Sequence, residues 1–260
     1  DPVVPSPELP DPVVLAAELA EAIRTWDDRL VATLGALAVP ELLAGIPESY
    51  KASVAPAQAV EDLRRVLALE PGGFAVRLYS NGSGEKRFTL YLADAPVTLT
   101  AVLPVLQQLG VEVLDERPAE FVRPDGHRCW VYDFGLALAG KRWPADDAGA
   151  FCAAFSAAWR GDAETDRFSA LVLGAGLHWR EAALLRAYGR YSRQLGSLFG
   201  QNYLADVLYA HPEVARGLVA LFRARFDPVP GGDARAAATD EALRHVTALI
   251  DEVAGLDADR

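Results

Sequence analysis

The sequence predicts a protein of the α+β class, in which one small sheet module lies between helical segments. Three observations support this class. Apolar and polar residues alternate in two pairs of short segments between residues 74 and 138, as in half-buried strands. Apolar residues spaced by three or four positions separate the two pairs and follow the second one, which is typical of amphipathic helices. The rest of the chain is rich in Ala, Leu and charged residues with the same helical spacing.

The N-terminal part is expected to be a linker followed by a helical segment. Residues 1–12 hold five prolines, which fix φ and lack an amide proton, so they predict an extended linker. Residues 13–72 are expected to be helical, with one amphipathic helix over 14–37 and another over 56–69. Pro56 suits the first turn of the second helix, because the missing N–H has no helical partner there.

Residues 73–160 are expected to form the sheet module in the order strand, strand, helix, strand, strand, helix, or ββαββα. The strands are predicted at 74–80, 87–94, 111–123 and 128–138, and the helices at 97–110 and 146–159. Asn81 and Gly82 should supply the positive φ values of the first hairpin, and Pro124-Asp125-Gly126 should form the second turn. This order is a circular reordering of the ferredoxin-like βαββαβ plan.

Residues 161–227 are expected to be a helical domain, and residues 228–260 a linker with a final helix. The helices are predicted at 163–173, 179–195, 201–209, 212–226 and 236–254. Gly174 and Gly176 could suggest a dinucleotide-binding loop, but Trp179 stands at the third glycine position and would block close helix packing. A turn between two helices is therefore expected here.

Composition excludes several classes of function. The formal net charge of -11 and a pI near 4.9 disfavour nucleic acid as a partner, because the overall field repels polyanions. The two cysteines suit a reducing, cytoplasmic location, and no apolar stretch or N-terminal pattern predicts a membrane span or signal peptide. Since the chain begins at Asp1 and holds no methionine, it is expected to be an interior piece of a longer polypeptide.

No enzyme can be assembled from the residues themselves. His127 and Cys129 come nearest to a metal-binding pair, but ordinary strand residues are expected and no metal site is predicted. The charged residues 115–117 and Asp133 are expected to form ion pairs or caps rather than a general acid/base pair, since nothing nearby would raise a carboxylate pKa toward neutrality. No catalytic residue is therefore predicted.

The segment 175–196 is basic within an acidic chain, with one acid, Glu181. Its arginines are Arg180, Arg186, Arg190 and Arg193. Helical geometry places the last three within about 60° of one another. The opposite side carries Leu184, Tyr188, Tyr191 and Leu195, and we expect that face to be ordinary core.

Two alternatives remain for the four arginines. One is a solvated stripe paired with nearby acids such as Asp162, Glu164 and Asp166. The other is an interface that docks on an acidic surface of another part of the same protein, because the planar guanidinium favours desolvated carboxylate pairs.

Residues 93–118 resemble the strand-loop-helix-strand core of ACT domains, small ferredoxin-like modules that often bind amino acids. The matching residues are Asp94, Pro96, Leu99, Val102, Leu103, Leu106 and Gly110. The resemblance implies an effector-binding loop made of Asp94, Ala95, Pro96, Val97, Thr98 and Leu99. Val97 stands where the family has a glycine that lets the backbone approach a ligand closely.

From about Tyr50 to the last residue, the chain is similar to successive segments of the large, NAD-specific bacterial glutamate dehydrogenases. The Trp-Arg-Gly block at 159–161 and the Trp-Arg-Glu block at 179–181 are the most specific matches. The resemblance implies a parent enzyme that converts L-glutamate, NAD and water to 2-oxoglutarate, ammonium and NADH. It also implies that these segments precede the catalytic domain, so that the catalytic lysine, aspartate and NAD-binding glycines follow Arg260 and this segment binds no cofactor.

Within such an enzyme, the segment is expected to be a regulatory and architectural arm that couples effector sensing or oligomer assembly to catalysis. Its partners would be the enzyme's own catalytic domain, neighbouring subunits and an amino-acid effector. One alternative is a purely structural oligomerisation spacer without ligand, and another is a free-standing amino-acid sensor or nucleic-acid adaptor.

Overall fold

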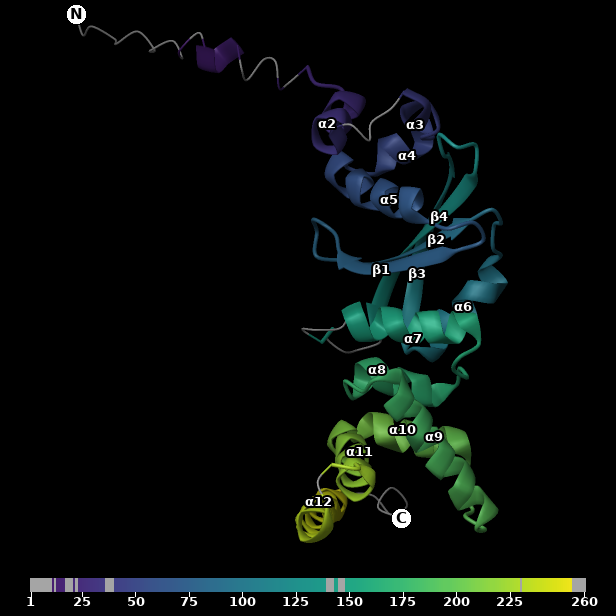
Figure 1. The fold of residues 1–260 in the computed structure, drawn as a ribbon, viewed down its shortest axis with the longest axis vertical. Helices are drawn as coiled ribbons and strands as arrows, with labels where there is room; N and C mark the ends of the chain where they lie inside the picture. The colour runs from purple at the N-terminus through teal and green to yellow at the C-terminus, as the bar shows by residue number, and fades with distance from the viewer. Residues whose placement is uncertain are drawn as a thin grey trace, which may run out of the picture. The chain divides into compact units, whose positions relative to one another are not determined.

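The computed structural model describes residues 11, 13–16, 21, 23–35, 40–138, 143–144, 148–229 and 231–253 (Figure 1). Except for Asp11, the expected linker over 1–12 lies outside these residues. The chain divides into two compact units. The first contains residues 1–75, 91–96 and 118–131, and the second contains residues 76–90, 97–117 and 132–260. Each unit is described by itself below.

One four-stranded antiparallel sheet confirms the α+β class. Its strands are β1 (Phe74–Ser80), β2 (Lys86–Ala93), β3 (Val111–Val122) and β4 (Arg128–Leu138). The strand order across the sheet is β1-β2-β4-β3. Helix α6 (Leu99–Gln108) connects β2 to β3, so β4 lies between the two strands that this helix joins.

The two hairpin turns differ in how well the sequence predicts them. The positive φ in the first turn belongs to Gly84, at 83°, and not to Asn81 or Gly82, so that prediction was wrong. Asn81 instead uses its side-chain oxygen to accept hydrogen bonds from the backbone N–H groups of Ser83 and Glu85, at 3.1 and 2.9 Å. The second turn forms as predicted, with Gly126 at a φ of 84°.

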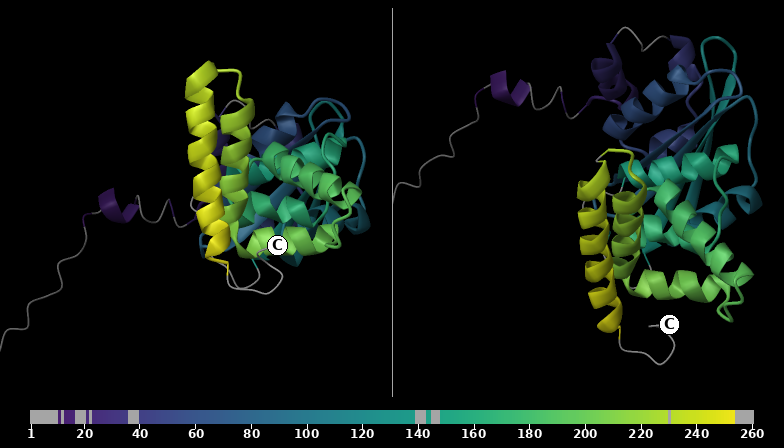
Figure 2. Two further views of the ribbon diagram at one scale, coloured as in Figure 1. Left: turned by 90° about the horizontal axis from the view of Figure 1, so that it is seen from below. Right: turned by 60° about the horizontal axis from the view of Figure 1, so that its bottom comes forward.

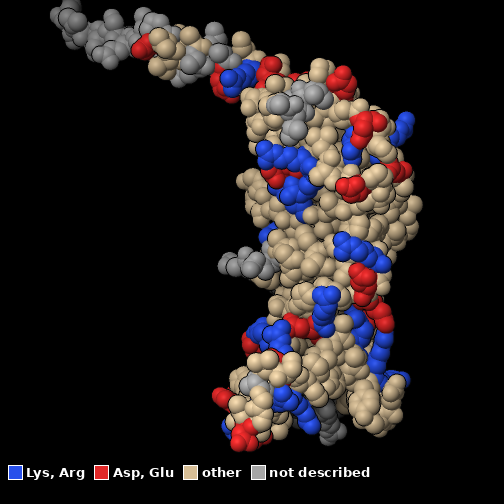
Figure 3. All heavy atoms as spheres, in the orientation of Figure 1, with Lys and Arg blue, Asp and Glu red and all other residues tan. Residues whose placement is uncertain are grey.

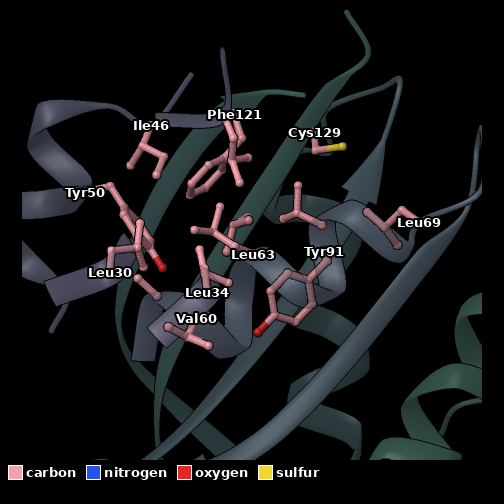
Figure 4. Close-up of a cluster of buried hydrophobic side chains, with 14 of the residues drawn as sticks. Leu30, Leu34, Ile46, Tyr50, Val60, Leu63, Leu69, Tyr91, Phe121 and Cys129 are labelled. Atoms are coloured by element: carbon pink, nitrogen blue, oxygen red, sulfur yellow. The ribbon is translucent and has the colours of Figure 1, made fainter. Parts of the chain in front are cut away.

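Among the described residues, the first unit contains helices α2 to α5 and the ends of all four strands. The helices are α2 (Trp26–Leu34), α3 (Pro40–Ala44), α4 (Glu48–Ser53) and α5 (Pro56–Ala68). Figure 4 shows side chains of α2, α4 and α5 gathered in one cluster with Tyr91, Phe121 and Cys129 from the strands. Leu63 of α5 is fully buried in this core, as the apolar pattern of the predicted helix requires.

The helix predicted over residues 14–37 is not continuous. Residues 24 and 25 are not helical, and α2 begins at Trp26. The reason is a capping box: the Thr25 hydroxyl accepts from the Asp28 backbone N–H at 3.1 Å, and Asp28 accepts from the Thr25 backbone N–H at 2.9 Å. Residues 17–20, 22, 36 and 37 lie outside the part of the chain that the structure describes.

A buried carboxylate lies in the core of the first unit. Asp62 of α5 accepts hydrogen bonds from the hydroxyl groups of Tyr50 and Tyr91, both at 2.6 Å, and from the Gln58 amide at 3.0 Å. These three bonds compensate the cost of removing the carboxylate from water. The network ties α4 and α5 to the end of β2.

The second unit contains the remaining parts of the strands, α6 and all later helices. Helix α7 (Ala148–Arg160) presents Phe151 and Phe155 to Phe88 of β2, at ring-centroid distances of 5.5 and 4.6 Å. All three rings are buried. Apolar packing therefore fixes α7 on the sheet of this unit, as the four-residue spacing of its aromatic residues indicates.

The later helices follow in order along the chain. They are the 3-10 turn η2 (Arg167–Ala170), α8 (Leu171–Gly174), α9 (Trp179–Gln194), α10 (Gln201–Ala210), α11 (Pro212–Phe226) and α12 (Gly232–Asp251). Helices α11 and α12 lie side by side in both views of Figure 2. The helix predicted from Ala163 was wrong in its start, because Asp166 caps the 3-10 turn at Arg167.

The glycines at 174 and 176 lie at the junction between two helices, as predicted: Gly174 ends α8, and Gly176 is in the turn before α9. A Cβ added to Gly174 would lie 2.3 Å from the ring of Tyr209 on α10, so only glycine fits beneath this tyrosine. Gly176 has a φ of 66°, which ends α8 before α9 begins.

Candidate functional site

The loop predicted to bind an effector joins the end of β2 to the start of α6. Asp94 has a φ of 68°, a left-handed conformation that aspartate tolerates better than most residues. Asp94, Ala95, Pro96, Thr98 and Leu99 are exposed, and Val97 is half-buried. Thr98 is the N-cap of α6 but makes no side-chain capping hydrogen bond to this helix.

The Asp94 carboxylate is held by two partners within the first unit. One oxygen accepts from the Gly72 backbone N–H at 2.8 Å, and the other lies 2.7 Å from Nδ1 of His127. The hydrogen bond with His127, followed by the one from Gly72, lowers the pKa of Asp94 below its ordinary value. The same pair raises the pKa of His127. The sequence reasoning singled out His127 beside Cys129, but its partner is Asp94.

The backbone of Val97 also has a partner, in the second unit. Its N–H donates to the Tyr132 hydroxyl of β4 at 3.1 Å. Tyr132 is buried and was missed by the sequence reasoning. No signal in the sequence identified it, because the contact depends on the register of β4 against the loop.

A second candidate region is the basic helix α9. His178 is its N-cap: the Nδ1 atom accepts from the Arg180 backbone N–H at 3.2 Å, and Glu181 accepts from the His178 backbone N–H at 2.8 Å. Arg180 is exposed and stacks 4.2 Å from the ring of Trp179. This reciprocal capping explains why the helix begins at Trp179.

Arg186 is buried, with only 5% of its surface exposed. Its guanidinium binds the Asp166 carboxylate with two hydrogen bonds, from Nε at 2.7 Å and from Nη2 at 2.9 Å. Nη2 also lies 3.3 Å from the Ser169 hydroxyl. Arg186 therefore fixes α9 on the η2 turn, and its charge is neutralised by Asp166 within the second unit.

The other arginines lie on the surface. Arg190 pairs with Glu164, and this hydrogen bond lowers the pKa of Glu164 and raises that of Arg190. Arg193 is exposed, and no carboxylate partner is found for it among the described residues. Arg186 and Arg190 therefore pair with two of the acids named in the first alternative, but Arg186 is buried and does not belong to a solvated stripe.

The apolar face of α9 does not form the core that its pattern predicted. Tyr188, Tyr191 and Leu195 are 49%, 55% and 70% exposed. The buried face carries Ala182, Leu185, Arg186 and Gly189 instead. The reason is close approach: a Cβ on Gly189 would lie 3.1 Å from the Gln201 amide and 3.3 Å from Phe168, so α10 and η2 pack directly against this side of α9.

The exposed apolar face borders a groove between α9 and α11, which we name the α9/α11 groove. Its volume is about 630 Å³. It is lined by Leu184, Leu185, Tyr188, Tyr191, Leu218, Leu221, Phe222, Arg225 and Phe226. The Tyr188 ring packs edge-on against Phe222 at a centroid distance of 6.2 Å.

A third cluster of charged groups lies in the sheet of the second unit. Arg87 of β2, which is 2% exposed, donates to Asp133 at 2.5 Å and to Asp115 at 2.7 Å. Burial alone would lower the pKa of Arg87, but the Asp115 hydrogen bond and the Asp133 charge raise it. Asp115 and Asp133 therefore form ion pairs, as predicted. Arg87 itself was missed, although Gly135 on the neighbouring strand leaves the space it occupies.

No described residues form a cluster of three or more His, Cys, Asp or Glu side chains that could hold a metal ion. No helix in the part of the chain that the structure describes is long and apolar enough to cross a membrane.

Two family models match the chain. Residues 73–148 match the model described as "Glutamate dehydrogenase, ACT3 domain", and residues 163–228 match the one described as "Glutamate dehydrogenase, helical motif 3". The first range contains the sheet, α6 and the 94–99 loop. The second contains η2, α8, α9, α10 and α11, and hence the arginines and the α9/α11 groove.

Three curated proteins, each named NAD-specific glutamate dehydrogenase, are similar to this chain. The one from Mycobacterium tuberculosis is 38% identical over 260 residues, which cover 93% of this chain and 16% of that protein. The one from Halomonas elongata is 36% identical over 264 aligned residues, which cover 95% of this chain and 16% of that protein. The one from Pseudomonas aeruginosa is 38% identical over 230 aligned residues, which cover 83% of this chain and 14% of that protein. The chain thus spans about a sixth of the length of these relatives.

Proposed function

Because the chain belongs to the family of the large NAD-specific glutamate dehydrogenases, we propose that it is a regulatory and architectural segment of such an enzyme. The parent enzyme converts L-glutamate, NAD and water to 2-oxoglutarate, ammonium and NADH. The observation that carries this proposal is the succession of two matched modules, ACT3 at 73–148 and helical motif 3 at 163–228, within one similar stretch of the relatives.

We also propose a domain organisation for this segment. An ACT-like, ferredoxin-like ββαββα domain spans 73–160, preceded by the linker over 1–12 and the helical segment over 13–72. A helical domain spans 161–227, and residues 228–260 lead to the catalytic domain. The split β2-α6-β3 unit, with β4 between its two strands, supports the ferredoxin-like plan.

The effector site is proposed at the loop formed by Asp94, Ala95, Pro96, Val97, Thr98 and Leu99. Its support is the exposure of this loop and the absence of a side-chain cap from Thr98 for the first N–H groups of α6. Such groups suit the carboxylate of an amino acid. A ligand that binds one state of the enzyme better than the other shifts the equilibrium between them.

A specific observation favours the alternative of a structural segment without ligand. The Val97 N–H is bound to the Tyr132 hydroxyl, and the Asp94 carboxylate is bound to Gly72 and His127. An effector would have to compete with these groups or use the α6 amides alone. In this second candidate function, the loop simply fixes the start of α6.

For the basic helix, we propose that docking on an acidic surface of the catalytic domain or a neighbouring subunit uses Arg180 and Arg193. Arg190 can contribute by exchanging Glu164 for another carboxylate. Arg186 supports the interface by holding α9 in place through Asp166. Arg180 and Arg193 are exposed, and among described residues neither has a carboxylate partner.

NAD is the cofactor of the proposed parent enzyme and is held there by residues outside this segment. We place the parent in the cytoplasm, because a chain of this size with only two cysteines suits a reducing compartment.

The reaction is tested with the full-length parent enzyme by measuring NAD reduction in the presence of L-glutamate. Glutamate-dependent NADH formation is the expected result. A well-folded full-length enzyme that shows no NADH formation with glutamate would contradict the proposal.

The regulatory role is tested by adding a panel of amino acids to the same assay. We expect at least one amino acid to change the rate or the melting temperature of the full-length enzyme. Asp94→Asn and Thr98→Ala should weaken this response, whereas the matched change Thr33→Ala on α2 should leave it intact. No response to any amino acid would favour the structural alternative.

A further inference from the structure

The α9/α11 groove is an apolar surface on two helices, each of which already packs another face against its neighbours. Helix α11 buries Val214, Ala215, Gly217 and Val219. A Cβ on Gly217 would lie 3.1 Å from Val246, so α12 packs directly on that side of α11. The buried face of α9 lies against η2 and α10. The groove is therefore an apolar face that remains beside these contacts, with the buried Leu185 at its border.

The groove has the composition of a protein-binding surface. Tyr188, Tyr191 and Phe226 line it and are each about half exposed, and the Phe222 ring lies 4.8 Å from that of Phe226. Aromatic residues in a continuous apolar patch with a polar rim are typical of interfaces. Two helices that diverge from a close contact leave a groove that suits the apolar face of a third helix.

Charge indicates the kind of helix that would fit. Helices α9 and α11 together carry seven arginines and two glutamates, in a chain with a net charge of -11. Both glutamates are already paired, Glu181 with Arg223 and Glu213 with Arg216. Arg225 lines the groove, is exposed, and has no carboxylate partner in the part of the chain that the structure describes. Figure 3 shows charged side chains interspersed with uncharged surface over these helices.

An acidic partner therefore fits this surface better than a second copy of the same surface, since a second groove would bring another Arg225 and no carboxylate to pair with the first. The relatives supply a source for such a partner, because this chain covers only 16% of the length of the Mycobacterium tuberculosis protein.

We propose that the α9/α11 groove holds an amphipathic helix, with an apolar stripe flanked by Asp or Glu, from the part of the parent polypeptide outside this chain. The inference rests on the proposed parentage. It names the surface by which helical motif 3 contacts the rest of the enzyme. The carboxylates of the incoming helix would pair with Arg225, and its apolar residues would cover Tyr188, Tyr191 and Phe226.

The test is site-specific photo-crosslinking in the full-length enzyme. A p-benzoylphenylalanine replaces Phe226 in one variant and Tyr188 in another, and both positions lie in the groove. The control variant carries the same group in place of Leu198, which is exposed but does not line the groove. After irradiation, mass spectrometry identifies the crosslinked peptides.

We expect both groove positions to crosslink to one shared peptide, outside the sequence of this chain, with apolar residues at helical spacing and flanking acids. The Leu198 variant should not crosslink to that peptide. The proposal is overturned if folded groove variants give no crosslink, crosslink to residues of a second copy of this chain, or capture only an unrelated protein.

Charge complementarity is tested by Arg225→Glu in the Tyr188 crosslinking variant. The yield at subsaturating conditions should fall about 2- to 5-fold, as expected for one exposed ion pair. Arg64→Glu on α5, another exposed arginine, should leave the yield unchanged. When an acidic residue of the captured peptide is replaced by lysine, the yield of the Arg225→Glu variant should be restored. An unchanged yield in the Arg225→Glu single variant would contradict recognition of an acidic partner.

Glutamate-dependent NAD reduction by the wild-type enzyme distinguishes a failure of the groove proposal from a failure of the proposed parentage. An active enzyme without the expected crosslink would contradict the groove proposal but not the parentage. An inactive, well-folded enzyme would contradict the proposed parentage, on which the groove proposal rests.

Discussion

Two regions of the second unit each bury an arginine against aspartate, but they differ in what happens to the apolar residues nearby. On β2, Arg87 is enclosed by Asp115 and Asp133, and the following strand residues up to Ala93 are buried. On α9, Arg186 is enclosed by Asp166, whereas Tyr188 and Tyr191 remain half exposed.

The comparison shows that hydrophobicity alone does not decide which face of an element is buried. Residues 87–93 of β2 are all buried, so the charge of Arg87 must be matched in place. A surface helix has a choice of faces, and small residues such as Gly189 let the neighbouring helices approach the side that carries Arg186. The displaced apolar face then becomes available for binding.

The largest expected effect follows from Arg87→Met, which breaks the sheet cluster. It leaves Asp133 partly buried without its cation, so unfolding free energy should fall by about 3–5 kcal/mol. Urea denaturation measures this loss. The double variant Arg87→Met with Asp133→Leu should recover much of it; a single variant as stable as the wild type would show that the cluster is not a stabilising unit.

Arg186→Met should have a smaller effect, about 1–3 kcal/mol, because Asp166 is partly exposed and water can hydrate it. The same denaturation assay applies. Arg190→Met is the matched control, since the Arg190 pair with Glu164 is exposed, and it should unfold like the wild type. Equal losses of unfolding free energy at the two positions would contradict the idea that the buried pair stabilises the fold more than the exposed pair.

Gly174→Ala tests close approach in the helical region. The added Cβ would lie 2.3 Å from the Tyr209 ring, so a loss of about 1–2 kcal/mol is expected. Gly149→Ala on α7 is the control: no atom lies within 4 Å of its Cβ, and alanine should stabilise the helix by up to about 1 kcal/mol. Thermal unfolding should therefore shift in opposite directions for the two variants.

The smallest effect concerns the exposed Asp94–His127 pair. His127 has a pKa raised above its ordinary 6.5, so its contribution is present below that value and is lost as pH rises through the raised pKa. Asp94 has a pKa lowered from 3.8, so its contribution is lost as pH falls through the lowered pKa. The pair should therefore stabilise the loop most between the two ordinary values.

An NMR titration of the His127 ring measures this coupling. Asp94→Asn should move the pKa of His127 down toward 6.5, although Asp125 and Arg123 also act on this ring in opposite directions. Asp125→Asn is the control and should produce a smaller decrease. An unchanged His127 pKa in Asp94→Asn would contradict the assigned pair.

Local patterns predicted most of the elements. The alternation over residues 74–80 and 128–138 matches β1 and β4, and Pro212 opens α11 as expected. Prediction failed where side chains compete with the backbone for hydrogen bonds. Thr25 and Asp166 each cap a helical element in the middle of a pattern that looked continuous.

For the candidate site, the sequence identified residues but not their contacts. It selected Asp94 and the four arginines, and its list of acids for the arginines included Asp166 and Glu164. It did not find Tyr132 or Gly72 beside the 94–99 loop, because these partners come from other strands or turns whose register no local pattern encodes.

The sequence by itself determined the α+β class, the succession of elements and the resemblance to glutamate dehydrogenases, since these depend on local periodicity and on residue blocks along the chain. The tertiary structure alone decided that Arg87 and Arg186 are buried and that the Leu/Tyr face of α9 borders an open groove. The physical reason is that burial depends on which neighbours can approach: Gly135 allows this beside Arg87, far from it in sequence, and Gly189 allows it one helical turn from Arg186.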